Sequence, residues 1–200
     1  MAIDFSPVHR KETVIGTYAR QFSVNDMRVA TDDSINTLLD IVGDATDAEI
    51  VFLPFDPDAN DPYAKPGEEK IGWSLGHLVA HVTATSEETA AIASILARGV
   101  PYGKEPRLRY ETPWQDITTR DQAVQRLEES RRMRHAYLAA FPDVPHLENE
   151  RELPETLIQH WGNMNAQGQF LLGLVHETEH HAQFREVKRQ AREASLAEKV

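Results

Sequence analysis

The chain has 200 residues and a net charge of −11, with 32 acidic side chains against 21 lysines and arginines. A chain this acidic has no general positive field, which argues against nonspecific binding to nucleic acid or to an anionic membrane. It contains no cysteine, which excludes disulfides, a thiol nucleophile of its own and cysteine ligands, so any metal must be held by histidine and oxygen atoms.

Neither a secretion signal nor a membrane span is evident. Residues 1–21 have no long apolar run, and no window approaches the ~20 apolar residues that cross a bilayer. We therefore expect a cytoplasmic protein without a membrane partner. A hydrophobic content of 40% is enough for the core of one globular domain of this length.

The first predicted helix begins at Ser23. Residues 1–22 show no clear period, and we expect an extended or loosely packed N-terminal arm there. From Ser23 to Val42, apolar side chains recur every three or four residues, which is typical of a helix with one buried face. Gly43 marks the expected end of this helix.

The second predicted helix has the clearest pattern in the chain. It follows a linker at residues 54–70, where four prolines prevent a helix. From Ile71 to Leu96, apolar residues and threonines alternate spacings of three and four, which is typical of a bundle helix. Three apolar residues before the linker could pack into the core: Val51, Phe52 and Leu53.

Two further helices are predicted in the second half of the chain. Thr119 to Gln122 forms a capping box that opens the third helix, whose charged middle is expected to be partly exposed or to contact a partner. The fourth begins near Thr156 or Asn163 and ends near Ala194, with a buried seam of Met164, Leu171, Val175, Thr178 and Ala182. The sequence therefore predicts an all-α protein, a four-helix bundle with long connecting loops over residues 23–195 and a tail at 196–200.

The fourth predicted helix contains three histidines within the sequence HETEHHAQ, which runs from His176 to Gln183. His176 and His180 are four residues apart, so on a helix they share a face and both can reach one transition-metal ion. Glu177 lies about 100° round the helix from His176 and could act as general base on a metal-bound water. Gln183 returns to the same stripe as His176.

A catalytic metal site of this kind needs a third protein ligand. The second predicted helix offers His77 and His81, which are also one turn apart. His81 lies at the edge of the buried seam, so it can converge with the pair on the fourth helix if the two helices pack side by side. His77 alone is more typical of a partly exposed polar residue near a helix start.

The segment from His176 to His180 also spells HExxH, the zinc-protease motif. A protease of that kind needs a third ligand further along the chain and a sheet edge that aligns the substrate. Only residues 181–200 follow the motif, and no strand-like alternation precedes it. A zinc protease is therefore kept as the minor alternative.

Two motifs together resemble the DinB/YfiT-like superfamily of four-helix bundles. The first is Trp73-Ser74-x4-Val79-x-His81, and the second is His176-x3-His180-x2-Gln183. In that family, the histidine eight residues past the tryptophan and the two histidines of the last motif are metal ligands. The resemblance thus assigns the metal to His81, His176 and His180, with Gln183 orienting a ligand or bound water beside them.

The last motif departs from the usual family pattern, H-x-x-H-H-R-G-Q. Glu179 replaces the first of the paired histidines, and His181-Ala182 replaces Arg-Gly. The ligand positions are kept while the residues around them differ, which leaves the substrate open.

The resemblance implies a divalent metal, zinc or nickel, often in a homodimer. Characterised relatives include transferases and isomerases that use an external low-molecular-weight thiol (bacillithiol, mycothiol or glutathione), which the metal binds and ionises; others are called hydrolases. We expect a small-molecule substrate and no nucleic-acid partner, and three loop residues are candidates for gripping an acidic substrate or cofactor: Arg107, Arg109 and Tyr110. The alternative is a non-catalytic metal-binding bundle that acts through association.

Overall fold

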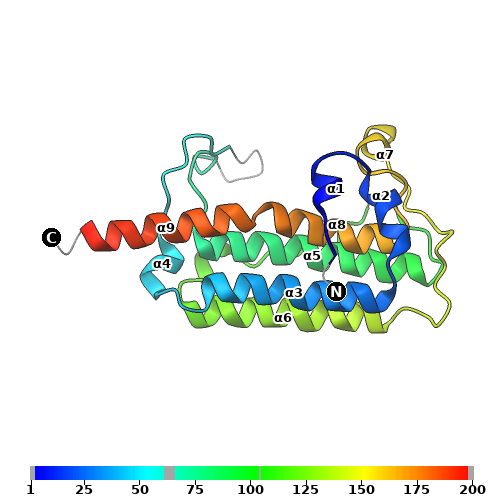
Figure 1. Cartoon of the computed structure of the whole chain (residues 1–200), viewed down its shortest axis with the longest axis horizontal. Helices are drawn as coiled ribbons and strands as arrows, with labels where there is room; N and C mark the ends of the chain where they lie inside the picture. The colour runs from blue at the N-terminus through cyan, green and yellow to red at the C-terminus, as the bar shows by residue number, and fades with distance from the viewer. Residues whose placement is uncertain (1–2, 61–65, 104, 198–200) are drawn as a thin grey trace.

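The computed structural model describes residues 3–60, 66–103 and 105–197. Four long helical rods lie side by side in it (Figure 1), and the described residues contain no strand. The rods are α3 (Val24–Val42), α5 (Leu75–Ala97), α6 (Arg120–Ala139), and α8 (Ala166–Glu179) continued by α9 (His181–Ala197). The predicted all-α four-helix architecture is confirmed.

Short elements precede the first rod or connect the rods. They are α1 (Ser6–His9), α2 (Ile15–Tyr18), the 3₁₀ turn η1 (Ala19–Gln21), α4 (Asp47–Val51), the 3₁₀ turn η2 (Trp114–Asp116) and α7 (Glu155–Trp161). The linker at 54–70 and the stretch at 99–118 are otherwise irregular in their described parts, and residues 61–65 and 104 lie outside those parts. No described helix is both long and apolar enough to cross a bilayer.

The helix starts follow local side-chain chemistry. Ser23 caps α3 by accepting a hydrogen bond from the Asp26 amide (3.2 Å), while the Asp26 carboxylate accepts one from the Ser23 amide (2.8 Å). Thr119 and Gln122 form the same reciprocal pair at the start of α6. These capping boxes satisfy backbone donors that a helix leaves open. The box at Thr119 was predicted as such, whereas the start at Ser23 was predicted from the apolar period that begins there.

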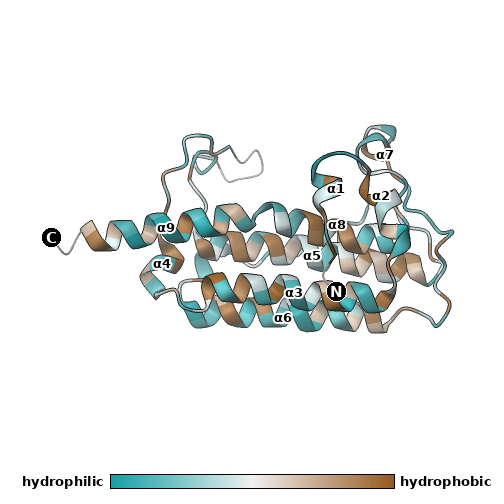
Figure 2. Cartoon of the chain, viewed as in Figure 1, coloured by the Kyte–Doolittle hydropathy of each residue, from teal (hydrophilic) through white to brown (hydrophobic). Residues whose placement is uncertain are grey.

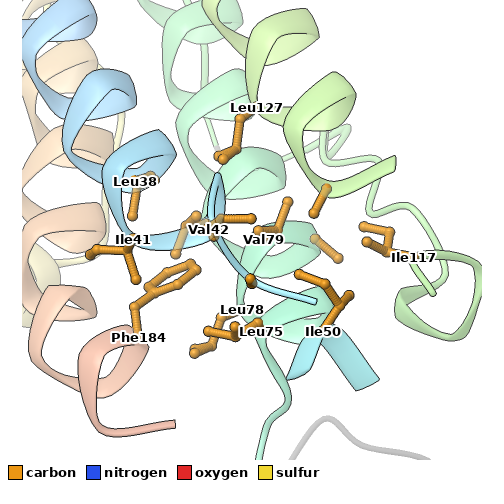
Figure 3. Close-up of a cluster of buried hydrophobic side chains, with 14 of the residues drawn as sticks. Leu38, Ile41, Val42, Ile50, Leu75, Leu78, Val79, Ile117, Leu127 and Phe184 are labelled. Atoms are coloured by element: carbon orange, nitrogen blue, oxygen red, sulfur yellow. The ribbon is translucent and has the colours of Figure 1, made fainter. Parts of the chain in front are cut away.

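The core lies where the rods meet α5. At one end of the bundle, apolar side chains from four rods interlock: Leu38, Val42, Leu78, Leu127 and Phe184 (Figure 3). In Figure 2, hydrophilic residues predominate along α9, whereas α5 carries more hydrophobic residues, as its central position requires. Because α5 is buried on several sides, its position against its neighbours is fixed. The positions of the side chains on its less buried face are fixed with it.

Helices α5 and α8 run antiparallel and approach closely at Gly173. A Cβ at this position would meet Thr89 Oγ1 and come within 2.9 Å of Ser86 Cα. The Ser86 hydroxyl donates to the Gly173 carbonyl oxygen at 3.2 Å. The glycine therefore sets the distance between the two helices that carry most of the histidines discussed below.

We expect Gly173→Ala to lower the free energy of unfolding by about 1–3 kcal/mol, as overpacking usually does. This loss outweighs the helix preference of alanine, which is at most ~1 kcal/mol. Gly103→Ala is the matched control, because its Cβ would have no neighbour closer than 3.8 Å. Urea unfolding of both variants checks this, and equal midpoints for the two would contradict it.

The N-terminal segment differs from the expectation of an extended or loosely packed arm. Within its described part it forms α1, α2 and η1, and Phe5, Ile15 and Ala19 are buried against the bundle. These residues are too irregularly spaced to show a period, yet each fills a gap between longer elements. The structure also differs from the expectation that the residues before the first linker pack into the core. Val51 and Leu53 are about half exposed, while Ile50 on α4 is buried.

The fourth predicted helix is interrupted. Gly162, with φ of +78°, ends α7, and α8 begins only after the Asn165 cap. At His180 the α-helical pattern breaks again, since its amide donates to Glu177 rather than to His176. Beyond this break Ala182 is exposed, contrary to prediction, and the buried residues are Phe184, Val187 and Ala191.

Candidate metal centre

Three histidines from distant parts of the chain meet between α5 and the junction of α8 with α9. His81 Nε2 lies 3.1 Å from His176 Nε2, which lies 3.3 Å from His180 Nε2. One ring nitrogen from each of the three falls within 4.8 Å of the others, and among the described residues this group alone could hold a metal ion. The structure thus brings together the three predicted ligands.

The donor set fits a divalent ion. Tetrahedral zinc sites place imidazole nitrogens 2.0–2.1 Å from the ion, which puts neighbouring ligand atoms ~3.3 Å apart, close to the two separations seen here. Burial, with the neighbouring histidines and Arg109, lowers the pKa of His81 to about 2 and that of His176 to about 4. Neutral imidazoles with facing Nε2 atoms are the form that binds metal.

Gln183 lies beside the third ligand. Its side-chain oxygen is 2.8 Å from His180 Nδ1, an arrangement in which Nδ1–H donates and Nε2 is left unprotonated. Contacts of this type fix the tautomer and ring orientation of a metal-ligating histidine. The sequence spacing had placed Gln183 on this stripe.

An aromatic wall flanks the cluster and separates it from His77. The Trp73 ring lies 4.6 Å from the His81 ring and 6.0 Å from the His180 ring. His77 is stacked between Trp73 and Trp114, at 4.6 and 4.9 Å. Of the two histidines on α5, only His81 therefore joins the cluster. Neither tryptophan's contact with a histidine could be deduced from helical periodicity, because both lie outside α5.

Glu177 does not face the histidines. Its carboxylate is fully buried and accepts hydrogen bonds from Arg134 Nη2 (2.7 Å), from Arg134 Nη1 (3.2 Å), from Ser86 (3.1 Å) and from Ser34. Burial acts to raise the pKa of Glu177, but the Arg134 charge and the hydrogen bonds outweigh it and the pKa is lowered. The expectation that Glu177 acts as general base is therefore corrected. Its carboxylate is hydrogen-bonded to side chains on α6 and α3 and does not face the three histidines.

A cavity of about 1480 Å³ opens beside the cluster, and His81 and His176 line it. Arg107 and Arg109 also line it, whereas Tyr110 does not and is 75% exposed. The expectation that Tyr110 grips a substrate is thus not supported by its position. Periodicity in the sequence did not single out two other lining residues, Arg151 and Gln169.

We expect the metal-free protein to lose stability as the pH falls below ~6.5. In the unfolded chain His81 and His176 titrate near 6.5, but in the folded chain their pKa values are lowered, so the unfolded state binds more protons. This contribution to the free energy of unfolding is therefore fully present above pH ~6.5 and is lost as the pH falls, through pH ~4 for His176 and further down for His81, by up to about 1.4 kcal/mol per pH unit for each histidine.

Urea unfolding of metal-free protein at pH 7.5, 6 and 5 measures this slope. His176→Asn should show a shallower slope than the wild type. A wild-type midpoint that stays constant across this range would contradict the expectation.

The model of the DinB superfamily matches residues 30–184, which include the three clustered histidines and Gln183. No curated protein and no solved structure matches the chain. The match begins within α3 and ends at Phe184 in α9, so it covers most of the four-helix bundle. The chain therefore belongs to the DinB superfamily.

Proposed function

We propose that this protein is a divalent-metal-dependent enzyme that acts on a small molecule. His81, His176 and His180 would hold the ion, zinc or nickel. The observation that carries the proposal is the convergence of three Nε2 atoms beside a cavity of about 1480 Å³. When bound, the ion supplies Lewis-acid chemistry that lowers the pKa of a coordinated thiol or water.

The chain's own residues prepare this centre for binding. Gln183 holds the proton of His180 at Nδ1, so that Nε2 points at the other two ligands. Trp73 packs against His81 and His180. A chain without cysteine needs an external thiol for thiol-dependent transfer or isomerisation, whereas hydrolysis needs only water.

Metal analysis of protein purified without an affinity tag tests the first part of the proposal. We expect about one ion per chain, and a loss of most of it in His176→Ala. His146→Ala serves as the matched control, because His146 is exposed and outside the cluster. Substoichiometric metal that does not change in His176→Ala would reject the assignment of the ligands.

The second part is tested by turnover assays on metal-loaded protein. One panel supplies bacillithiol, mycothiol or glutathione with electrophilic substrates, and the other supplies esters and amides alone. Turnover that disappears in His176→Ala supports an enzyme. Bound metal without turnover in either panel favours the alternative of a non-catalytic metal-binding bundle. Light scattering would test the accompanying proposal of a homodimer.

A further inference from the structure

Three arginines line the cavity, and their surroundings differ. Arg107 forms an ion pair with Glu88 (2.7 Å), and Arg109 forms one with Glu111. Arg151 has no ion pair with any residue in the described part of the chain. The positive charge at the Arg151 end of the cavity is therefore not neutralised by a carboxylate in direct contact.

Arg151 is held rigidly. Its amide donates to the Met164 carbonyl oxygen (2.8 Å), its Nε to the Gly103 carbonyl oxygen (3.1 Å) and its Nη1 to Gln169 Oε1 (3.2 Å). The guanidinium also lies 5.6 Å from the centre of the Tyr102 ring. Burial lowers the pKa of Arg151. These contacts fix the guanidinium and leave its Nη2 donors unused by any of them.

Gln169 adds a second donor at the same place. It is 1% exposed, it lines the cavity, and its Nε2 has no hydrogen-bond partner. The amide orientation is fixed, because Arg151 can only donate and so must face the oxygen. A buried donor without an acceptor costs about 1–3 kcal/mol. Two adjacent side chains thus have N–H groups without acceptors from the protein, and that of Gln169 is buried.

The position of Gln169 relates this end of the cavity to the metal centre. Gln169 precedes His176 by seven residues on α8, which places it on the same stripe about 10 Å away along the helix axis. The wall between them includes Leu172 and Val175 of α8 and Ile92 of α5, and the α5 side also carries Thr85, Glu88 and Thr89. The cavity therefore has donors at one end, an apolar strip along its α8 side and imidazoles at the other end.

We propose that Arg151 and Gln169 bind the carboxylate of the substrate. The substrate class is then a small molecule with an apolar body and a carboxylate about 10 Å from its reacting atom. A planar monoanion suits one guanidinium and one amide donor, whereas a phosphate dianion would call for a second guanidinium, and the other two arginines of the cavity are already paired with Glu88 and Glu111. The position of the reacting atom at the metal rests on the proposed function. The binding of a carboxylate by Arg151 and Gln169 does not require the metal.

Metal-free protein tests the subsite by itself, with octanoate and its uncharged counterpart 1-octanol as probes in calorimetric titrations. We expect octanoate to bind at least ~10-fold more tightly, as a hydrogen-bonded charged group implies. Arg151→Gln should abolish this preference, and Arg107→Gln should retain most of it because Arg107 is already paired with Glu88. Equal affinities in the wild type, or equal losses in both variants, would overturn the proposal.

The Gln169→Glu variant distinguishes a loss of octanoate binding from a loss of folding. The new carboxylate would lie beside Arg151 and take the place of the ligand. The octanoate preference should disappear while the melting temperature stays the same or rises. Wild-type octanoate affinity in Gln169→Glu would overturn the proposal.

Zinc-loaded protein then tests whether the metal centre and the carboxylate subsite, at the two ends of the cavity, bind one molecule at the same time. We expect ω-mercapto-octanoate to bind at least ~10-fold more tightly than octanoate, because its thiol reaches the metal while its carboxylate reaches Arg151. Equal affinities of ω-mercapto-octanoate and octanoate would overturn the proposed distance of about 10 Å between the carboxylate subsite and the metal. If no metal binds but the octanoate preference holds, the proposed function fails and the subsite stands. If metal binds stoichiometrically without an octanoate preference, only the substrate class fails.

Discussion

Arg134→Met is expected to lower the free energy of unfolding by about 3–5 kcal/mol, the range for removing one partner of a buried ion pair. The side chains of Arg134 and Glu177 are 1% and 0% exposed and pair at 2.7 Å. Without the guanidinium, Glu177 keeps only the hydroxyls of Ser34 and Ser86 as partners. The variant would therefore bury a charge without a counter-ion between three helices. Urea unfolding at pH 7.5 measures the loss.

Two further variants give this prediction its controls. Arg134→Met combined with Glu177→Leu removes both charges and should recover much of the loss, because apolar residues of similar volume often replace a buried pair without a penalty. Arg131→Met breaks partly exposed pairs with Asp32 and Glu128 and should change stability by less than ~1 kcal/mol. If Arg134→Met were no worse than Arg131→Met, the Glu177 network would not be a major determinant of stability.

Metal binding should produce the second large effect. An ion that binds the folded chain and not the unfolded one stabilises it by about 2.7 kcal/mol at a free concentration one hundred times the dissociation constant. For a chain of this length that corresponds to a rise in melting temperature of about 5–10 °C. Thermal unfolding with and without a chelator measures this rise.

His176→Ala should remove the dependence on the chelator, since His176 Nε2 lies between the other two ligand atoms. His146→Ala should show the full wild-type shift. A chelator effect of the same size in wild type and His176→Ala would place the stabilising ion elsewhere. The control also excludes a general effect of histidine loss.

The parts of the fold that could be predicted are those set by local chemistry. The caps at Ser23 and Thr119 and the periodic apolar face of α5 follow from side chains within a few residues of one another. The short helices at the N-terminus were missed because Phe5, Ile15 and Ala19 are buried by distant elements. Their burial has no counterpart in local spacing.

The residues of the site likewise divide into those that local spacing could predict and those that it could not. The one-turn spacing of His176 and His180 and the position of Gln183 are properties of a helix, and the structure keeps them together despite the break at His180. His81 was placed with them from the family motif and from the expected packing of two helices. Gln169 could have been found, because it lies seven residues before His176 on the same stripe.

The sequence by itself therefore indicated the four long helices, and it placed His176 and His180 on one face, since spacing along a helix decides which side chains share a face. His81 and the family were indicated by the motif resemblance. Only the tertiary structure decided where Glu177 points and which arginine is unpaired. Glu177 is adjacent to a predicted metal ligand, yet it faces Arg134 on another helix. Arg151 differs from Arg107 and Arg109 in that the fold brings no carboxylate into direct contact with it. Such differences depend on which distant residues meet, and spacing along one helix contains no information about that.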